Sequence, residues 1–282
     1  MKIIVLGVGG MLGHLAGIFL KEKYGARVVL SARAKSGVAL IDQGLSVVDL
    51  ADAKSVQAML AQHRPCIVVN CAAINDAGQG FEALDKINTR LPQMLASMLD
   101  ENKDGSRLIH ISTDGVFRGD RGRYSEEDSP DADDLYGKSK RGGEVARLPH
   151  LTIRTSIIGP DPFKARGLRT WFMSQETDPK GFTKVFWSGV TTLEMAKFID
   201  FAINENISGL YHLCSQRISK HDLLTIIKDV FARDVVIKQD EALVLDRSLI
   251  SKRTDIGYKV LGLRQLIDQL KAWMSEHSAL YY

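Results

Sequence analysis

The hydrophobic pattern at the start of the chain predicts a strand, a turn and a helix in succession. Residues 2–6 form a short apolar run rich in β-branched side chains, as expected for a buried strand. Four of the next seven residues are glycine, and residues 14–23 then have helical character. This succession is typical of the opening unit of a dinucleotide-binding fold.

Apolar runs continue to alternate with helical patterns through the first half of the chain. Strands are expected at residues 27–31, 44–50, 66–70, 107–112 and 151–154, and helices at 52–62, 81–99 and 136–148. Parallel strands need long crossover connections, which are usually helices. The alternation therefore predicts an α/β fold with a Rossmann-type, doubly wound parallel sheet.

Beyond residue 155 the alternation weakens, which indicates a second unit of different architecture. Short strands are expected at residues 182–186, 210–213 and 235–238, and helices at 195–203, 219–231 and 263–275. We expect an NAD(P)-binding domain over residues 1–155. Residues 156–282 should form a smaller, partly interleaved substrate lobe, with some segments returning to the Rossmann sheet.

Composition narrows the class of protein. The 282 residues carry a formal net charge of +3, which is too balanced to favour nucleic acid or a membrane surface as a partner. Cys66, Cys71 and Cys214 lack metal-ligand spacing and suggest reduced thiols in a cytoplasmic protein. Residues 3–20 also resemble a signal peptide or a short membrane span, but their glycines argue against a continuous helix.

The glycine-rich turn is the expected seat of a dinucleotide. The familiar G-x-G-x-x-G spacing would need glycine at position 12, whereas Gly7, Gly10 and Gly13 form a G-x-x-G-x-x-G. Glycine permits a tight turn, and the helix that follows offers free N–H groups to a pyrophosphate. The residues expected to contact the cofactor here are Gly7, Gly9, Gly10, Met11, Leu12 and Gly13.

The expected end of the second strand bears on the form of the cofactor. An acid at this place would favour NAD by binding the ribose 2′-hydroxyl, but the chain has Arg33 and Lys35 instead. These cations suit a 2′-phosphate, so we favour NADPH and leave NADH open. A solvated basic loop is the alternative. Asp49 and Leu50, after the third strand, are expected to contact the adenine.

Small residues follow the fourth strand. Cys71, Ala72 and Ala73 would let the backbone lie against a cofactor. Asn88, inside the next helical pattern, is equally compatible with capping and with a place near the cofactor.

Two features define the candidate chemistry. Thr113 follows the fifth strand, and Tyr136 and Lys140 are four residues apart, so they lie on one helical face. A free tyrosine has a pKa of about 10, and a nearby ammonium would lower it. Tyr136 could then protonate an alkoxide formed by hydride transfer, while Thr113 donates a hydrogen bond to the same oxygen.

Five motifs stand in a familiar order: Gly7-x-x-Gly10-x-x-Gly13, Asn70-Cys71-Ala72-Ala73, Ser112-Thr113-Asp114-Gly115-Val116-Phe117, Tyr136-Gly137-Lys138-Ser139-Lys140 and Arg154-Thr155-Ser156. In this order they resemble the extended short-chain dehydrogenase/reductases of the dTDP-4-dehydrorhamnose reductase type. The resemblance implies an oxidoreductase of polysaccharide biosynthesis that reduces a nucleotide-linked 4-keto deoxysugar. It also implies that Thr113, Tyr136 and Lys140 are catalytic, with Lys140 and Tyr136 beside the nicotinamide ribose.

The chain departs from that family after the Thr-Asp pair. Those reductases usually carry a tyrosine where this chain has Gly115. Asp114 is expected to meet the substrate, and Arg154, Trp187 and Arg247 offer charge and stacking for its diphosphate or base. A plain surface role for either arginine is the alternative.

Other functions remain open at this level. One is a nucleotide-sugar epimerase or dehydratase with bound NAD, although related dehydratases carry a glutamate at the position of Gly115. Another is a non-catalytic NADP-binding regulatory subunit, as in methionine adenosyltransferase. No metal is expected, and a homodimer is left open.

Overall fold

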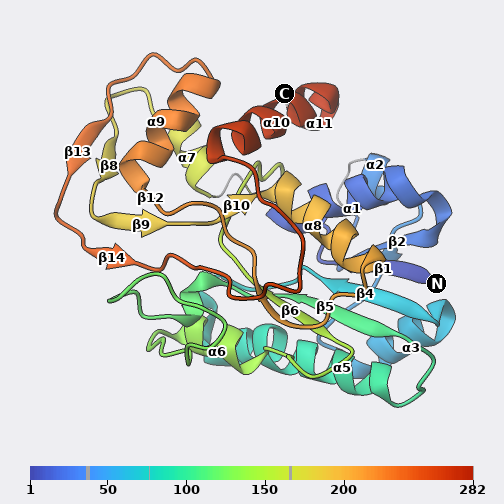
Figure 1. Cartoon of the computed structure of the whole chain (residues 1–282). Helices are drawn as coiled ribbons and strands as arrows, with labels where there is room; N and C mark the ends of the chain where they lie inside the picture. Colours follow the sequence, from blue (N-terminus) through green and yellow to red (C-terminus); the bar gives the residue numbers. More distant parts are fainter. Residues whose placement is uncertain (36–38, 76, 165–166, 282) are drawn as a thin grey trace.

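A seven-stranded parallel sheet organises the computed structural model, which describes residues 1–35, 39–75, 77–164 and 167–281 (Figure 1). Its order is β11-β6-β5-β4-β1-β2-β3. The strands are β1 Lys2–Leu6, β2 Val28–Ala32, β3 Ser46–Val47, β4 Cys66–Asn70, β5 Arg107–Ile111, β6 Leu151–Arg154 and β11 Gly209–His212. The order reverses between β1 and β4, and ligands of such sheets bind at the carboxyl ends of strands around this reversal.

Helices cover both faces of the sheet. Figure 1 shows α1 and α8 on one face and α3 and α5 on the other. The helices are α1 Met11–Tyr24, α2 Ala39–Asp42, α3 Ala53–His63, α4 Gly80–Leu84, α5 Leu91–Asp100, α6 Leu135–Gly142, α7 Leu168–Met173, α8 Thr192–Asn204, α9 Lys220–Val230, α10 Leu263–Glu276 and α11 Ser278–Tyr281. Because β1 contributes Ile3 and Val5 to one core and Ile4 and Leu6 to the other, a continuous apolar run was the correct signal for it.

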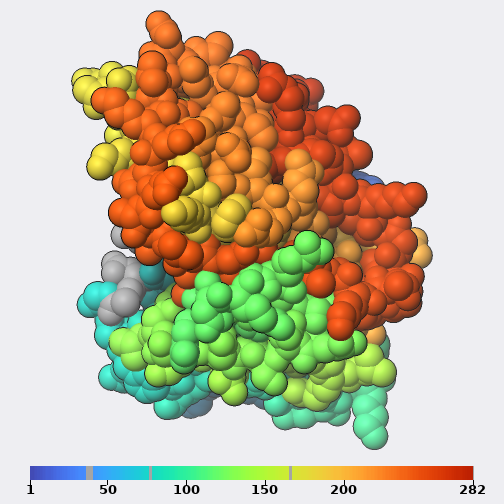
Figure 2. Space-filling view, turned by 60° about the vertical axis from the view of Figure 1, so that its left-hand side comes forward, coloured from blue at the N-terminus to red at the C-terminus, as the bar shows by residue number. Residues whose placement is uncertain are grey.

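The later part of the chain forms a smaller lobe and also completes the sheet. Its small sheets contain β7 Ile157–Ile158, β8 Lys180–Phe182, β9 Val185–Trp187, β10 Val190–Thr191, β12 Ile218–Ser219, β13 Lys238–Asp240 and β14 Leu245–Asp246. In contrast, β11 pairs with β6 at the edge of the central sheet. Figure 2 shows the yellow-to-red part of the chain resting on the green segment that contains the loop before α6.

The prediction of a Rossmann-type parallel α/β fold is confirmed, and several boundaries are corrected. The helix expected over 136–148 ends at Gly142, and the next residue, Gly143, packs so closely on the carbonyl oxygen of Asn88 that a side chain would collide with it. The helix expected over 81–99 contains a π-helical turn at Asp85–Arg90. Pro92 lies in the first turn of α5, directly after this π-helical turn.

Three predicted strands also differ. The run 182–186 is divided between two strands, β8 and β9, and the run 44–50 contains only the short strand β3. The strand expected at 235–238 lies instead at β13, paired in parallel with β8. In the part of the chain that the structure describes, no helix combines the length and apolar character needed to cross a bilayer.

Candidate functional site

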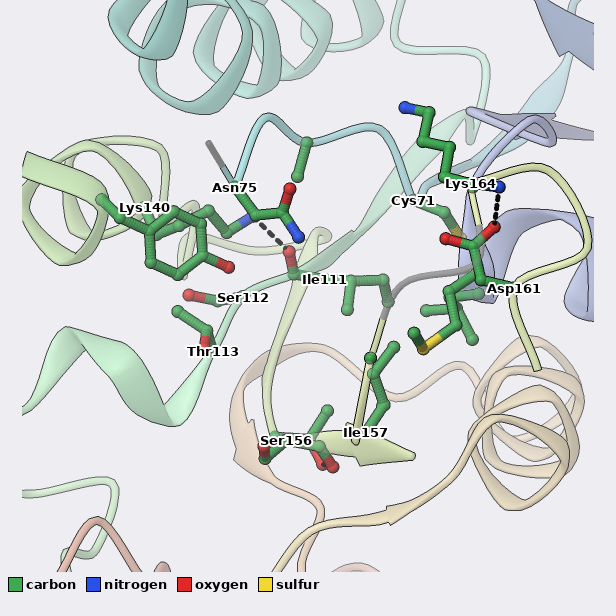
Figure 3. A pocket seen from close by; sticks show the side chains of 17 residues that line it. Cys71, Asn75, Ile111, Ser112, Thr113, Lys140, Ser156, Ile157, Asp161 and Lys164 are labelled. Atoms are coloured by element: carbon green, nitrogen blue, oxygen red, sulfur yellow. Dashed lines mark hydrogen bonds between the residues drawn. The ribbon is translucent and has the colours of Figure 1, made fainter. Parts of the chain in front are cut away.

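A cavity of about 360 Å³ opens at the carboxyl ends of the central strands (Figure 3). Its walls include residues 10–12 of the glycine turn, 111–113 after β5 and 155–157 after β6, together with Tyr136 and Lys140. Figure 3 shows Ser112, Thr113 and Lys140 on one side and Cys71, Asp161 and Lys164 on the other. The cavity thus joins the predicted cofactor turn to the predicted catalytic residues.

The glycine turn has a shape that side chains would prevent. Gly7 has φ +80°, and a Cβ there would lie 2.8 Å from the Cα of Ala72. A Cβ on Gly13 would collide with the carbonyl oxygen of Gly7, so only glycine lets α1 begin this close to the turn. A Cβ on Gly9 would meet no atom within 4 Å. The turn therefore leaves open space before the N-terminus of α1, which fits a pyrophosphate.

The residues predicted for the adenosine end lie where β2 and β3 finish. Arg33 is exposed, and within the described ranges no carboxylate pairs with its guanidinium. Asp49 is exposed and accepts a 2.9 Å bond from the amide of Ala51, while Leu50 is buried. An unpaired guanidinium after β2 fits a ribose 2′-phosphate.

The segment after β4 is held from behind by Asn88. Cys71 and Ala73 line the cavity, and the neighbouring residue Ile74 is bound twice by the Asn88 amide, at 2.7 and 2.9 Å. The same amide donates a 3.0 Å bond to the hydroxyl of Ser139 on α6. Asn88 is buried behind the wall, so it joins the cofactor-side segment to the helix that carries Tyr136.

Local bonds position the catalytic candidates. The hydroxyl of Thr113 donates to Oδ1 of Asp114 at 3.1 Å and accepts from the amide of Gly115 at 3.0 Å. Tyr136 lies in the first turn of α6, which Asp134 caps. On the same helix, Nζ of Lys140 donates to the carbonyl oxygen of Ile111 at 2.6 Å.

Burial dominates the electrostatics of this site. It raises the pKa of Tyr136 to about 12, while a hydrogen bond with Thr113 acts in the opposite direction. It also lowers the pKa of Lys140 to about 8. We expected Lys140 to lower the pKa of the tyrosine, and the structure corrects this, because desolvation outweighs every neighbouring charge. Tyr136 is therefore a protonated phenol at neutral pH, which suits a proton donor.

Two predicted substrate ligands do not line the cavity. Arg154 is buried and binds both carboxylate oxygens of Glu144, at 2.8 and 2.7 Å, so its charge is already neutralised. Trp187 is 3% exposed, and the ammonium of Lys220 lies 5.1 Å from its ring centroid. Neither side chain presents a free surface to a substrate in this structure, in contrast to what the sequence predicts.

The other two substrate candidates are close to the reacting residues. Burial raises the pKa of Asp114, and the charge of Lys220 opposes that rise. Arg247 makes a 3.5 Å ion pair with Asp134, which caps the helix that carries Tyr136. The positive charge of Arg247 opposes the rise in the pKa of Tyr136 that burial causes.

Sequence reasoning missed several cavity residues and one partly buried cation. The missed cavity residues include Asn75, Ser156, Asp161 and Lys164. The partly buried cation is Lys220, whose pKa is lowered by desolvation to about 8. A cation in the first turn of a helix opposes the helix dipole, and that signal was present at Lys220, which follows the cap Ser219. The others lie in irregular segments without such a signal.

Comparisons with known proteins identify a family and several similar proteins. The family model described as RmlD substrate binding domain matches residues 1–242. A probable dTDP-4,6-dihydroxy-2-methyloxan-3-one 4-ketoreductase of Streptomyces antibioticus is 35% identical over 161 residues, which are 56% of this chain and 50% of that protein. The chain thus spans about half the length of this curated relative.

Solved structures share the whole fold. A hypothetical dTDP-4-dehydrorhamnose reductase from Sulfolobus tokodaii has a TM-score of 0.76 and 26% identity, covering 93% of this chain and 98% of that one. A dTDP-4-dehydrorhamnose reductase from Bacillus anthracis, in complex with NADP, has a TM-score of 0.81 and 18% identity, covering 97% and 100%. At 18% identity, the similarity to the Bacillus anthracis structure shows a shared fold only.

Proposed function

The chain belongs to the RmlD substrate binding domain family, and from this premise we propose that it is an NADPH-dependent reductase of a nucleotide-linked 4-keto deoxysugar. One observation carries the proposal: Thr113, Tyr136 and Lys140 line the same cavity as the glycine turn. The names of the similar proteins, a 4-ketoreductase and a dTDP-4-dehydrorhamnose reductase, support this substrate class.

The residues of the chain would divide the work as follows. A bound nicotinamide supplies a hydride to the carbonyl carbon. Tyr136 gives its phenolic proton to the carbonyl oxygen as negative charge develops there, and its raised pKa keeps that proton available at neutral pH. The hydroxyl of Thr113 lines the same cavity, and it would donate a hydrogen bond to that oxygen in place of Asp114.

Lys140 has an electrostatic role in this scheme. Its ammonium is held by the carbonyl oxygen of Ile111, so it stays beside the cavity in one orientation. A fixed positive charge stabilises the phenolate that Tyr136 becomes after proton transfer. The positive charge is retained as long as the pH stays below the lysine's pKa of about 8.

The preference for NADPH rests on the adenosine end. The exposed Arg33 after β2 offers a cation for a 2′-phosphate, and no acid occupies the equivalent place. The Bacillus anthracis enzyme of the same fold was solved with NADP, which is consistent with this preference.

A direct assay of cofactor oxidation tests the proposal. Purified protein is mixed with NADPH or NADH and a panel of freshly prepared 4-keto nucleotide sugars, and absorbance of the reduced cofactor is followed. We expect net oxidation that falls about 10²- to 10⁴-fold in Tyr136→Phe, the usual contribution of a positioned proton donor. Tyr24→Phe, which removes a hydroxyl bound to Asp200 outside the cavity, is the matched control and should keep its activity.

The assay also separates the alternatives. If the protein binds the cofactor tightly but no keto sugar causes oxidation of NADPH or NADH, the proposed reductase activity is wrong and a regulatory subunit is favoured. Conversion of a sugar without net change in the cofactor would favour an epimerase or dehydratase. Gly115 provides no side chain that could act as the base of a dehydratase.

A further inference from the structure

His14, at the end of the first turn of α1, connects two distant parts of the chain. Its ring is fully buried. Nδ1 lies 2.9 Å from the carbonyl oxygen of Gly10, in the glycine turn. Nε2 lies 3.0 Å from the hydroxyl of Tyr281, on α11. A single side chain thus links α11 to the cofactor side of the cavity.

The chemistry of the partners determines which atoms donate. Burial lowers the pKa of His14 to about 4, so the ring is neutral at ordinary pH and has one N–H. The carbonyl oxygen of Gly10 can only accept, so this proton is on Nδ1. Nε2 is then the acceptor, and Tyr281 is the donor. The bonds therefore run in one direction, from Tyr281 through His14 to Gly10.

The direction of the Gly10 carbonyl determines the direction of the Met11 N–H. In a trans peptide, the carbonyl of one residue and the N–H of the next point in opposite directions. The carbonyl of Gly10 accepts both from the His14 side chain and from the His14 amide, at 3.1 Å, so its direction is doubly constrained. The N–H of Met11 consequently points away from the helix, and both Gly10 and Met11 line the cavity.

Further contacts hold the same assembly together. The ring of Phe163 meets His14 edge-on, with centroids 5.8 Å apart at 90°. Its neighbours Asp161 and Lys164 line the cavity. Nε2 of His277, just before α11, lies 2.8 Å from Oε1 of Glu22 on α1. These contacts hold the C-terminal segment against α1.

We propose that Tyr281 is a positioning residue for the cofactor: through His14 it fixes the Gly10–Met11 peptide so that its N–H faces the dinucleotide. The inference rests on the proposed function only in assuming that a dinucleotide binds in this cavity. It assigns α11 a role in cofactor affinity, although α11 does not line the cavity. The chemical steps at Tyr136 are unaffected by it.

Binding of NADPH to the full chain, followed by nucleotide fluorescence, tests the proposal. Tyr281→Phe removes one oxygen atom and leaves the ring in place. We expect the Kd for NADPH to rise roughly two- to tenfold, as for loss of one neutral hydrogen bond. The KM for the keto sugar and kcat at saturating NADPH should not change.

A matched variant separates this effect from general loosening. Tyr258→Phe also removes a partly buried hydroxyl, which bonds to Glu194 at 3.0 Å on α8, away from the cavity. It should leave the Kd for NADPH unchanged even if it lowers the melting temperature. His14→Asn retains an amide near the place of Nδ1, and Tyr281→Phe should have no further effect in its background.

Each outcome bears on one proposal or the other. If the unaltered protein binds NADPH and Tyr281→Phe binds it equally well, the positioning role is wrong and the proposed function stands. Equal losses in Tyr281→Phe and Tyr258→Phe would also overturn it, because they would reflect stability alone. A protein that binds no dinucleotide at all would overturn the proposed function and this inference with it.

Discussion

The ammonium of Lys140 donates a 2.6 Å hydrogen bond to the carbonyl oxygen of Ile111, the last residue of β5. A second bond nearby, 2.7 Å from the hydroxyl of Ser112 to Glu144, joins the same strand end to the segment that follows α6. The two bonds hold the helix that carries the tyrosine against the strand that leads to Thr113. The relative position of the catalytic residues is therefore determined by buried polar contacts.

Activity should fall as the pH rises through about 8. Burial lowers the pKa of Lys140 to about 8, so its stabilising charge is present below that pH and lost above it. Tyr136 keeps its proton over this range because its pKa is about 12. The measurement is kcat/KM for keto-sugar reduction between about pH 6 and pH 10.

A second lysine makes a control for this pH profile necessary. Burial also lowers the pKa of Lys220 to about 8. Arginine remains charged throughout this range. Lys140→Arg should therefore lose the descending limb, and Lys220→Arg should retain it. The opposite pattern would assign the limb to Lys220 and contradict the role given to Lys140.

Arg33→Ala should weaken NADPH much more than NADH. A charge-assisted bond to a 2′-phosphate corresponds to an affinity change of about ten- to a hundredfold. Dissociation constants for both cofactors give the result, with Lys35→Ala as a neighbouring cation for comparison. Equal affinities of the unaltered protein for NADPH and NADH would show that the preference is wrong.

Arg154→Ala should reduce stability without altering substrate binding in the folded protein. It leaves the buried carboxylate of Glu144 without its bidentate partner, which costs about 3–5 kcal/mol. Urea unfolding measures the loss, and the KM for the keto sugar shows whether the residue binds substrate. Replacing both partners, Arg154→Met with Glu144→Gln, should recover part of the stability. A raised KM in a variant of full stability would restore the original prediction for Arg154.

Gly13→Ala should impair both cofactor binding and stability. A Cβ there would collide with the carbonyl oxygen of Gly7, which is backbone and cannot rotate away, so α1 must shift from the turn. Gly257→Ala is the matched control, since a Cβ at that position meets no atom within 4 Å. Thermal melting and NADPH titration of both variants give the comparison. Normal NADPH affinity in Gly13→Ala would mean that the turn tolerates the shift.

The sequence by itself was sufficient to predict features that depend only on residues close together in the chain. The runs at β1 and β4 have the predicted bounds, because a strand buried on both faces requires continuous apolar residues. The four-residue spacing of Tyr136 and Lys140 placed them on one face of a helix, since helical geometry follows from spacing. The glycine turn was likewise recognisable from residue type, because only glycine adopts such a turn.

Tertiary structure decided what depends on residues far apart in the chain. Arg154 looked available for a substrate until its partner Glu144 was placed beside it. The pKa of Tyr136 follows from burial, which no spacing reveals. The link from His14 to Tyr281 joins residues 267 positions apart. Such contacts arise from packing of several elements at once, so a one-dimensional pattern contains the side chains but not their neighbours.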